Sequence, residues 1–225
     1  MTVGIEIYNN AGTIQIDENW RNYGFREKVT LTITTSNIVG SPYPQVVPYS
    51  LAITGTPALI VACRSTSQFP FRLHSYYDAG SWHINWHFWH DEGTSGTYEP
   101  STYTGTVDFF IFDTLEGTYG NVGLQVFNAS GQTVFHSDAS IMKISGVFAC
   151  TSSFSWSDGR SYAPIIMQIP AQGIFVSGSG NRIGQYCLRT VGSQIQSRRI
   201  INNTAGSGGT YSYSGLYAAI DVTGF

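Results

Sequence analysis

The most unusual stretch of the sequence runs from Trp82 to His90 and holds three tryptophans and three histidines. On a helix, His83, His87 and His90 would share one face, an arrangement that binds zinc. On a strand, His83 and His87 would share a face about 13 Å apart, at about 3.3 Å per residue, and His90 would lie on the other face. That separation is too large for one metal ion. Because the aromatic content favours a strand, we expect no metal site and no cofactor.

As a strand, this stretch has two different faces. One face would be apolar, formed by Trp82, Ile84, Trp86 and Phe88. The other would be more polar, formed by His83, Asn85, His87 and Trp89. Two interpretations stay open: packing in a core or a subunit interface, where aromatic residues are enriched, or a surface on which a sugar ring stacks. The candidate interface or glycan-stacking residues are Trp82, His83, Trp86, His87, Trp89 and Trp156.

Motifs for catalysis are absent. The sequence has no Gly-x-Ser-x-Gly, so it lacks the nucleophile elbow of the α/β-hydrolases. Asp91 and Glu92 precede a glycine and are more simply part of a solvated turn than a glycosidase pair. The glycines of 178–184 are followed by a strand-like segment, whereas a dinucleotide loop needs a helix N-terminus there. We therefore expect no catalytic residue and no enzymatic activity.

The composition narrows the class of protein further. The 225 residues are 42% hydrophobic and only 11% charged, against a usual charged fraction of about 25%. So few charges argue against long solvated helices, and 14% aromatic residues with a net charge of −3 argue against disorder. The eleven basic residues do not give the chain the excess of positive charge typical of proteins that bind nucleic acid. No apolar window reaches the roughly 18 residues of a membrane span.

The hydrophobic pattern is that of strands. Residues 28–34 alternate between aliphatic side chains and threonines, which predicts a half-buried strand with an exposed hydroxyl face. Continuous apolar runs, typical of strands covered on both faces, occupy 58–64, 107–112 and 165–169. No stretch of twelve residues keeps helical spacing. We expect an all-β protein built as an antiparallel β-sandwich.

One short pattern occurs twice. Residues 4–12 and 123–131 match position by position as glycine, aliphatic, Glu or Gln, aliphatic, aromatic, Asn, two small or polar residues, and glycine. An asparagine that starts a turn and a glycine with positive φ that ends it predict a β-hairpin in each copy. A hairpin motif would then recur in related halves, 1–117 and 118–225. We expect one all-β unit over 1–225, with one sandwich or two left open.

The cysteines indicate a reducing compartment. Cys63, Cys150 and Cys187 are an odd number, lie in apolar or strand-like runs and form no Cys-x-x-Cys motif. The first residues also lack the basic and apolar regions of a secretory signal. We expect three buried thiols in a protein made in the cytoplasm.

Three segments in the middle of the chain carry a resemblance. An aromatic strand ending in Phe-Asp (107–113), the hairpin of 123–131 and a strand end in Ser-Asp (133–138) follow one another. This order resembles small tail proteins of long-tailed, siphovirus-like bacteriophages and prophages, often encoded near the central tail-tip or fibre protein. Residues 3–9 are similar to the N-terminus of the same group. His136 stands where the pattern of that group leads us to expect Asp.

The resemblance implies a structural protein of the distal phage tail, associated with the tip or a fibre. Such a virion component is made in the host cytoplasm, forms homo-oligomers because the tail is rotationally symmetric, and docks on other tail proteins. Host attachment, through a surface receptor or glycan, is the further role it suggests. The alternative from the residues themselves is a carbohydrate-binding module that uses an exposed tryptophan platform. Copy number, docking partner and receptor are not encoded in any recognisable motif.

Overall fold

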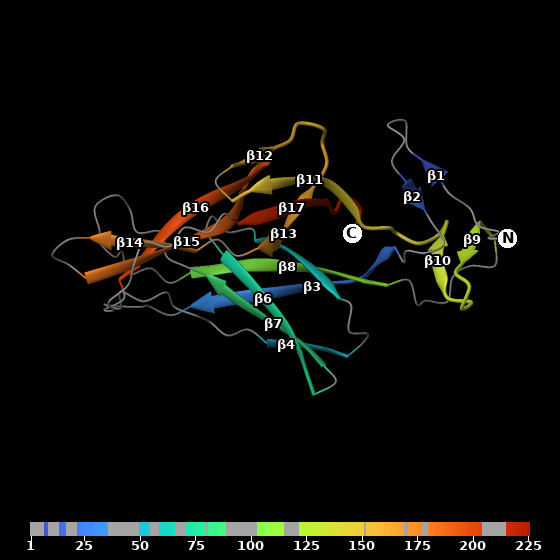
Figure 1. Ribbon diagram of the computed structural model, residues 1–225, viewed down its shortest axis with the longest axis horizontal. Coiled ribbons are helices and arrows are strands. Elements are labelled where there is room, and N and C mark those ends of the chain that lie inside the picture. The colour runs from blue at the N-terminus through green and yellow to red at the C-terminus, as the bar shows by residue number, and fades with distance from the viewer. Residues whose placement is uncertain are drawn as a thin grey trace.

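The computed structural model shows an all-strand architecture (Figure 1). It describes residues 7–8, 14–16, 22–35, 50–54, 59–65, 71–79, 81–88, 103–114, 122–150, 152–168, 171–176, 180–203 and 215–225. Within these ranges every regular element is a β-strand, and all strand pairs are antiparallel. The predicted all-β, antiparallel class is therefore confirmed, and the sandwich arrangement stays a prediction.

The strands in the described part form five sheets. Two are small hairpins: β1 (Ile7–Tyr8) with β2 (Ile14–Ile16), and β9 (Gln125–Phe127) with β10 (Thr133–His136). Two have three strands each, in the orders β3 (Tyr23–Thr35), β8 (Tyr103–Thr114), β5 (Ile60–Ser65) and β11 (Lys143–Ala149), β17 (Leu216–Asp221), β13 (Tyr162–Gln168). The largest has the order β12 (Phe154–Ser155), β16 (Gln194–Asn203), β15 (Gly180–Val191), β6 (Phe71–Asp78), β7 (Ser81–Phe88), β4 (Ser50–Thr54), with β14 (Ala171–Val176) paired to β15.

Strand β8 is covered on both faces, as its apolar run predicts. Val107, Phe109 and Ile111 belong to one buried cluster, which we call the first core cluster. Phe110 and Phe112, whose side chains alternate with those three, belong to a second core cluster. The first cluster also contains Val61 and Cys63 of β5, and Trp82 of β7 packs against it.

The second core cluster joins the two three-stranded sheets. Phe112 of β8 lies in the same cluster as Ala218 and Ile220 of β17. At its edge the rings of Phe25 and Phe225 stack with centroids 4.2 Å apart. An isolated bridge between Gly24 and Ile141 and a backbone hydrogen bond from Met142 to Tyr23 connect the sheets along one side.

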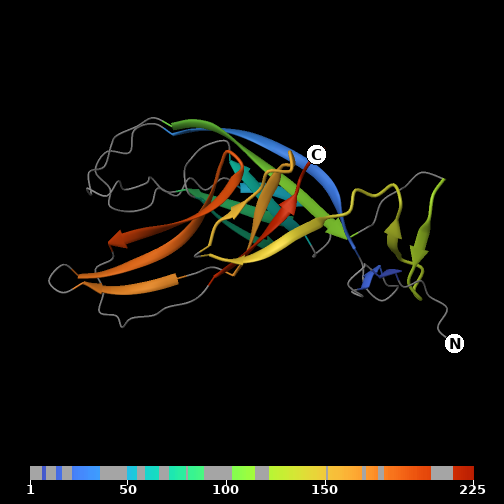
Figure 2. The same ribbon diagram turned by 90° about the horizontal axis from the view of Figure 1, so that it is seen from above.

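A third core cluster lies on the opposite face of β17. Tyr217 and Ala219 pack there with Leu188 of β15 and Ile195 of β16. Both Tyr217 and Ile195 are fully buried. The largest sheet therefore contributes to the first cluster through β7 and to the third through β15 and β16, and Figure 2 shows β15 and β16 running on beyond the end of β17.

The two small hairpins lie together at one end of the molecule (Figures 1 and 2). In the first, Ile7 pairs with Ile16 and Tyr8 with Ile14. In the second, Val126 pairs with Phe135 and Phe127 with Thr133. Each residue of the second hairpin is 119 positions after its counterpart (126 − 7, 135 − 16, 127 − 8 and 133 − 14), so the registers are equivalent. A relation between the two halves of the chain stays a prediction.

The turn of the second hairpin has the expected chemistry. The Asn128 Oδ1 atom accepts backbone hydrogen bonds from Ser130 at 3.0 Å and from Gln132 at 2.9 Å. Gly131 has φ of 76°, which only glycine adopts without strain. The corresponding turn after Tyr8 lies outside the described residues.

The cysteines lie in or beside the strands. Cys63 and Cys150 are buried thiols, as expected. Cys187 lies in β15, where its position pairs with Arg198.

Candidate functional site

The tryptophan- and histidine-rich segment forms β7, in agreement with the strand interpretation. It runs between β6 and β4 and pairs antiparallel with both. Asp78 pairs with Ser81, so only two residues connect β6 to β7, and Ala79 in this turn has φ of 47°. A turn this short fixes the register of the whole β6–β7 pair.

Trp82 contributes to the core of the protein. It is half-buried and packs against the first core cluster, as Val29 and Leu31 of β3 also do. Since side chains alternate along a strand, Trp86 occupies a position on the same face of β7. The packing interpretation of this face holds for Trp82, and the stacking of a sugar on it stays a prediction.

His83 and His87 occupy positions on the opposite face of β7 from Trp82. His83 is half-buried, and its strand neighbours are Tyr76 on β6 and Ala52 on β4. His87 pairs with Arg72 on β6. The positions of His83 and His87 therefore share one face of β7, and the polar character of that face stays a prediction.

Trp156 lies in a different part of the molecule. It packs in the third core cluster, with its ring centroid 5.7 Å from that of Phe154 and 5.1 Å from that of Tyr162. Its backbone N–H donates to the carbonyl of Ser193 at 3.1 Å. Trp89 lies outside the described residues. Four of the six candidate residues are thus on β7, and Trp156 is not part of the same cluster as Trp82.

A polar network that the sequence analysis missed connects the start of β13 to the end of β17. An Arg160 Nη1 donates to Asp221 Oδ2 at 2.9 Å, and the Tyr162 hydroxyl donates to Asp158 Oδ2 at 2.7 Å. The backbone N–H of Thr223 donates to the other oxygen of Asp221 at 3.0 Å. The two aspartates are 63 residues apart, and the local signal was the charged pair around Gly159 in a chain with few charges.

The electrostatics of this network keep both carboxylates ionised. The hydrogen bond from Tyr162 lowers the pKa of Asp158, and the same bond raises the pKa of Tyr162. Burial opposes ionisation of Asp221, but the hydrogen bonds from Thr223 and the charge of Arg160 outweigh it and lower its pKa. The charge of Asp221 in turn raises the pKa of Arg160. Both carboxylates accept hydrogen bonds and lie within ion-pair distance of Arg160, as in a structural link between strands.

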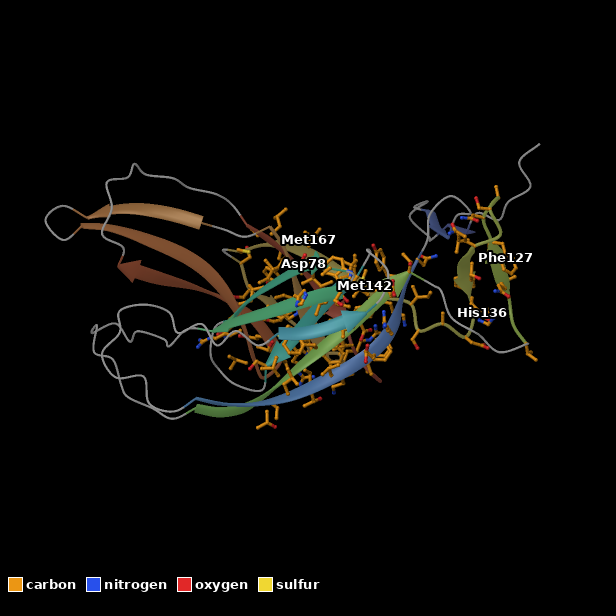
Figure 3. All side chains as sticks on the ribbon, turned by 90° about the horizontal axis from the view of Figure 1, so that it is seen from below. Asp78, Phe127, His136, Met142 and Met167 are labelled. Carbon is orange, nitrogen blue, oxygen red and sulfur yellow. The ribbon has the colours of Figure 1, made fainter. Side chains whose placement is uncertain are left out.

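Exposed apolar side chains gather at two places. Val122, Leu124 and Phe127 lie on the β9–β10 hairpin, and Val122 is 84% exposed. Figure 3 shows Phe127 on this hairpin, far from Asp78 and Met167. The second group lies on the three-stranded sheet of β11, β17 and β13, and consists of Ile144, Val147, Met167 and Leu216.

The described residues contain no group of three or more His, Cys, Asp or Glu side chains placed to hold a metal ion. In the same part of the chain, no helix has the length and hydrophobicity needed to cross a membrane. Comparisons of the chain with protein families, with curated proteins and with solved structures found no match.

Proposed function

We propose that the protein is a structural component of the distal tail of a long-tailed bacteriophage or prophage, associated with the tail tip or a fibre. It acts by self-association and by docking on other tail proteins, and it is assembled into the virion from the host cytoplasm. The observation that carries the proposal is the β9–β10 hairpin. Residues 123–131, which carry the resemblance to tail proteins, overlap the group of exposed apolar side chains at Leu124 and Phe127.

The hairpin exposes apolar side chains and is also connected to the rest of the protein. Val126 and Val134 are buried, and the Asn22 side chain donates to the Val134 carbonyl at 2.9 Å, which connects the hairpin to the start of β3. Leu124 and Phe127 are 46% and 51% exposed. Burying the exposed half of such a side chain against a partner stabilises the contact by about 1 kcal/mol. These residues contribute to an interface, and a stable contact needs further area beside them.

The oligomeric state of the full chain tests the proposal. We expect light scattering after size exclusion to show an oligomer at micromolar concentration, or a complex with co-expressed tail-tip neighbours. Phe127→Ser with Leu124→Ser should weaken that association at least tenfold. Met167→Ser, an equally exposed residue away from the hairpin, is the matched control. A monomer that binds no tail-tip neighbour contradicts the proposal.

The alternative, a carbohydrate-binding module, has less support from the positions of the tryptophans. Trp82 and Trp156 both pack in core clusters. Alanine at either position should then lower stability, and a glycan array should detect no sugar that the isolated protein binds. Specific glycan binding that Trp82→Ala abolishes in a folded protein would favour the module over the tail protein.

A further inference from the structure

Strand β11 forms one edge of its three-stranded sheet and is paired on one side only. Its partner is β17, and no other strand in the described part of the chain pairs with it. Figure 1 shows β11 on one side of β17 and β13 on the other. A free strand edge presents N–H and C=O groups that can form hydrogen bonds with another strand.

The register of β11 and β17 shows which backbone groups face the free edge. The Cys150 N–H donates to the Gly215 carbonyl at 2.8 Å, so the backbone groups of Cys150 face β17. Because this direction alternates from residue to residue in an antiparallel pair, those of Phe148 and Gly146 also face β17. The N–H and C=O groups of Val147 therefore point away from β17, towards the free edge.

The other edge of the same sheet is blocked by a proline. The Val222 N–H donates to the Ser161 carbonyl at 2.8 Å, and Pro164 of β13 is opposite Ala219. The same alternation places the nitrogen of Pro164 on the outer side of β13. A proline at this position cannot donate to a further strand, and it removes no hydrogen bond to β17. By contrast, β11 has no proline, and its only charged residue is Lys143 at its first position.

The exposed side chains of β11 continue the apolar face of the second core cluster. Val147 is opposite Ala218 and Ile144 is opposite Ile220, and both of these β17 residues belong to that cluster. Val147 is 52% exposed and Ile144 is 54% exposed. A strand added beside β11 would therefore cover apolar area as well as backbone groups.

We propose that β11 pairs antiparallel with β11 of a second copy of the chain, with the two-fold axis at Val147. In this register the two Val147 residues exchange both N–H···O=C hydrogen bonds. Gly146 is opposite Phe148 on the other face, so two bulky side chains do not oppose each other there. Lys143 lies beyond the paired segment, so like charges are not directly opposite. This fit of the strand to its own two-fold copy favours a second copy over an unrelated strand.

The contact is short at both ends. A β-bulge lies between Ile144 and Gly146, and a bulge bends its strand. The carbonyl of Ala149 already accepts from the Ser152 N–H at 2.9 Å. Pairing is therefore confined to residues 145–149, which is less than a standard interface, so we expect a weak dimer at high micromolar concentration. The inference rests on the self-association in the proposed function and gives it a contact separate from the β9–β10 hairpin.

Disulfide cross-linking of the full chain tests the register. Val147→Cys places two thiols directly opposite each other, with a Cα separation of about 5.5 Å, which a disulfide spans. Ile144→Cys is the matched control, because it is similarly exposed on the same face but its two copies would be about 20 Å apart. We expect mild oxidation to give at least about tenfold more covalent dimer from Val147→Cys than from Ile144→Cys. The wild type gives the background from the native cysteines.

A second pair of variants tests the hydrogen bonds at the edge. Val147→Pro removes the outward N–H and keeps the bonds of β11 to β17, as Pro164 does on β13. It should weaken dimerisation at least about tenfold in sedimentation equilibrium, because both central hydrogen bonds are lost. Val147→Thr keeps the N–H and the β-branched shape, and it should dimerise as the wild type does.

Equal cross-linking of Val147→Cys and Ile144→Cys, including none in either, would overturn the proposal, whether or not Val147→Pro folds. The variant Phe127→Ser with Leu124→Ser separates this contact from the hairpin, and Val147→Cys should cross-link equally well in that background. Association that the hairpin variant abolishes, with no cross-link at Val147→Cys, overturns the edge contact and leaves the proposed function standing. A Val147→Cys cross-link in a chain that binds no tail-tip neighbour supports the edge contact and counts against the tail assignment.

Discussion

Tyr217 makes the third core cluster sensitive to alkaline pH. Its side chain is fully buried, its hydroxyl donates to the Ser152 carbonyl at 3.2 Å, and burial raises its pKa to about 12. The unfolded chain ionises this group at about pH 10. Because the folded pKa is the higher one, the stabilisation is complete below pH 10 and is lost as the pH rises towards 12.

Tyr217→Phe separates the hydrogen bond from this ionisation. At neutral pH the variant should lose about 1 kcal/mol of unfolding free energy, since one neutral hydrogen bond is removed and the acceptor lies in an exposed residue that water can reach. At about pH 11, one unit above the ordinary pKa, the wild type should lose about 1.4 kcal/mol to the ionisation of Tyr217 in the unfolded chain. The variant does not have this loss, so the two stability curves should cross near pH 11.

Urea denaturation at a series of pH values between about 7.5 and 11 measures both effects. The change in tyrosinate absorbance on unfolding gives an independent count of the groups that ionise. Ser152→Ala keeps the carbonyl acceptor and should match the wild type throughout. A constant difference between wild type and Tyr217→Phe across this pH range would refute the reasoning.

Three further predictions concern other parts of the fold. Asp221→Asn should lower the unfolding free energy by about 1–3 kcal/mol at neutral pH, because it removes the charge that pairs with Arg160. Since the pKa of Asp221 is lowered in the folded protein, this stabilisation is present above about pH 4 and is lost as the pH falls. Urea titrations should therefore show that the unfolding free energy of the variant falls less steeply with decreasing pH than that of the wild type. Gly123→Ala should disrupt the second hairpin, because φ is 141° and a methyl group would collide with a serine hydroxyl across the hairpin, whereas Gly131→Ala meets open space and should cost only about 1 kcal/mol in thermal unfolding. The Cys150 thiol, whose pKa burial raises to about 11, should react with an aromatic disulfide reagent in urea and not in the native protein, and rapid native labelling would contradict its burial.

Local patterns were sufficient to predict individual strands. The apolar run at 107–112 is part of β8, which is buried on both faces, and the alternation at 28–34 is part of β3, where Thr30 and Thr32 are exposed and Val29 and Leu31 face the core. In these segments the order of apolar and polar residues along the sequence directly determines which side chains are buried. The turn at Asn128 was also predictable, because its hydrogen bonds span only four residues.

Contacts between distant segments could not be predicted in this way. Leu188 pairs with Phe71 and Arg160 binds Asp221, and no local period encodes either partner. The histidine-rich strand shows the same limit, because its own period does not reveal that the position of His74 on β6 pairs with that of Asn85 on β7. The tryptophans could be assigned to a strand face, but which face the core would cover depends on β3, β5 and β8.

The position of β17 has a consequence for synthesis of the chain. It is the central strand of its sheet, yet it follows β11 and β13 in the sequence, so neither of them has its partner until residues 216–221 have left the ribosome. Until then, the apolar faces of β5 and β8 in the second cluster also lack their cover from Ala218 and Ile220. A translation product interrupted before Leu216 would present unpaired strand edges to its neighbours, which is a hazard for aggregation. We therefore expect chaperones and proteases to act on products that end before Leu216 much more than on products that contain β17.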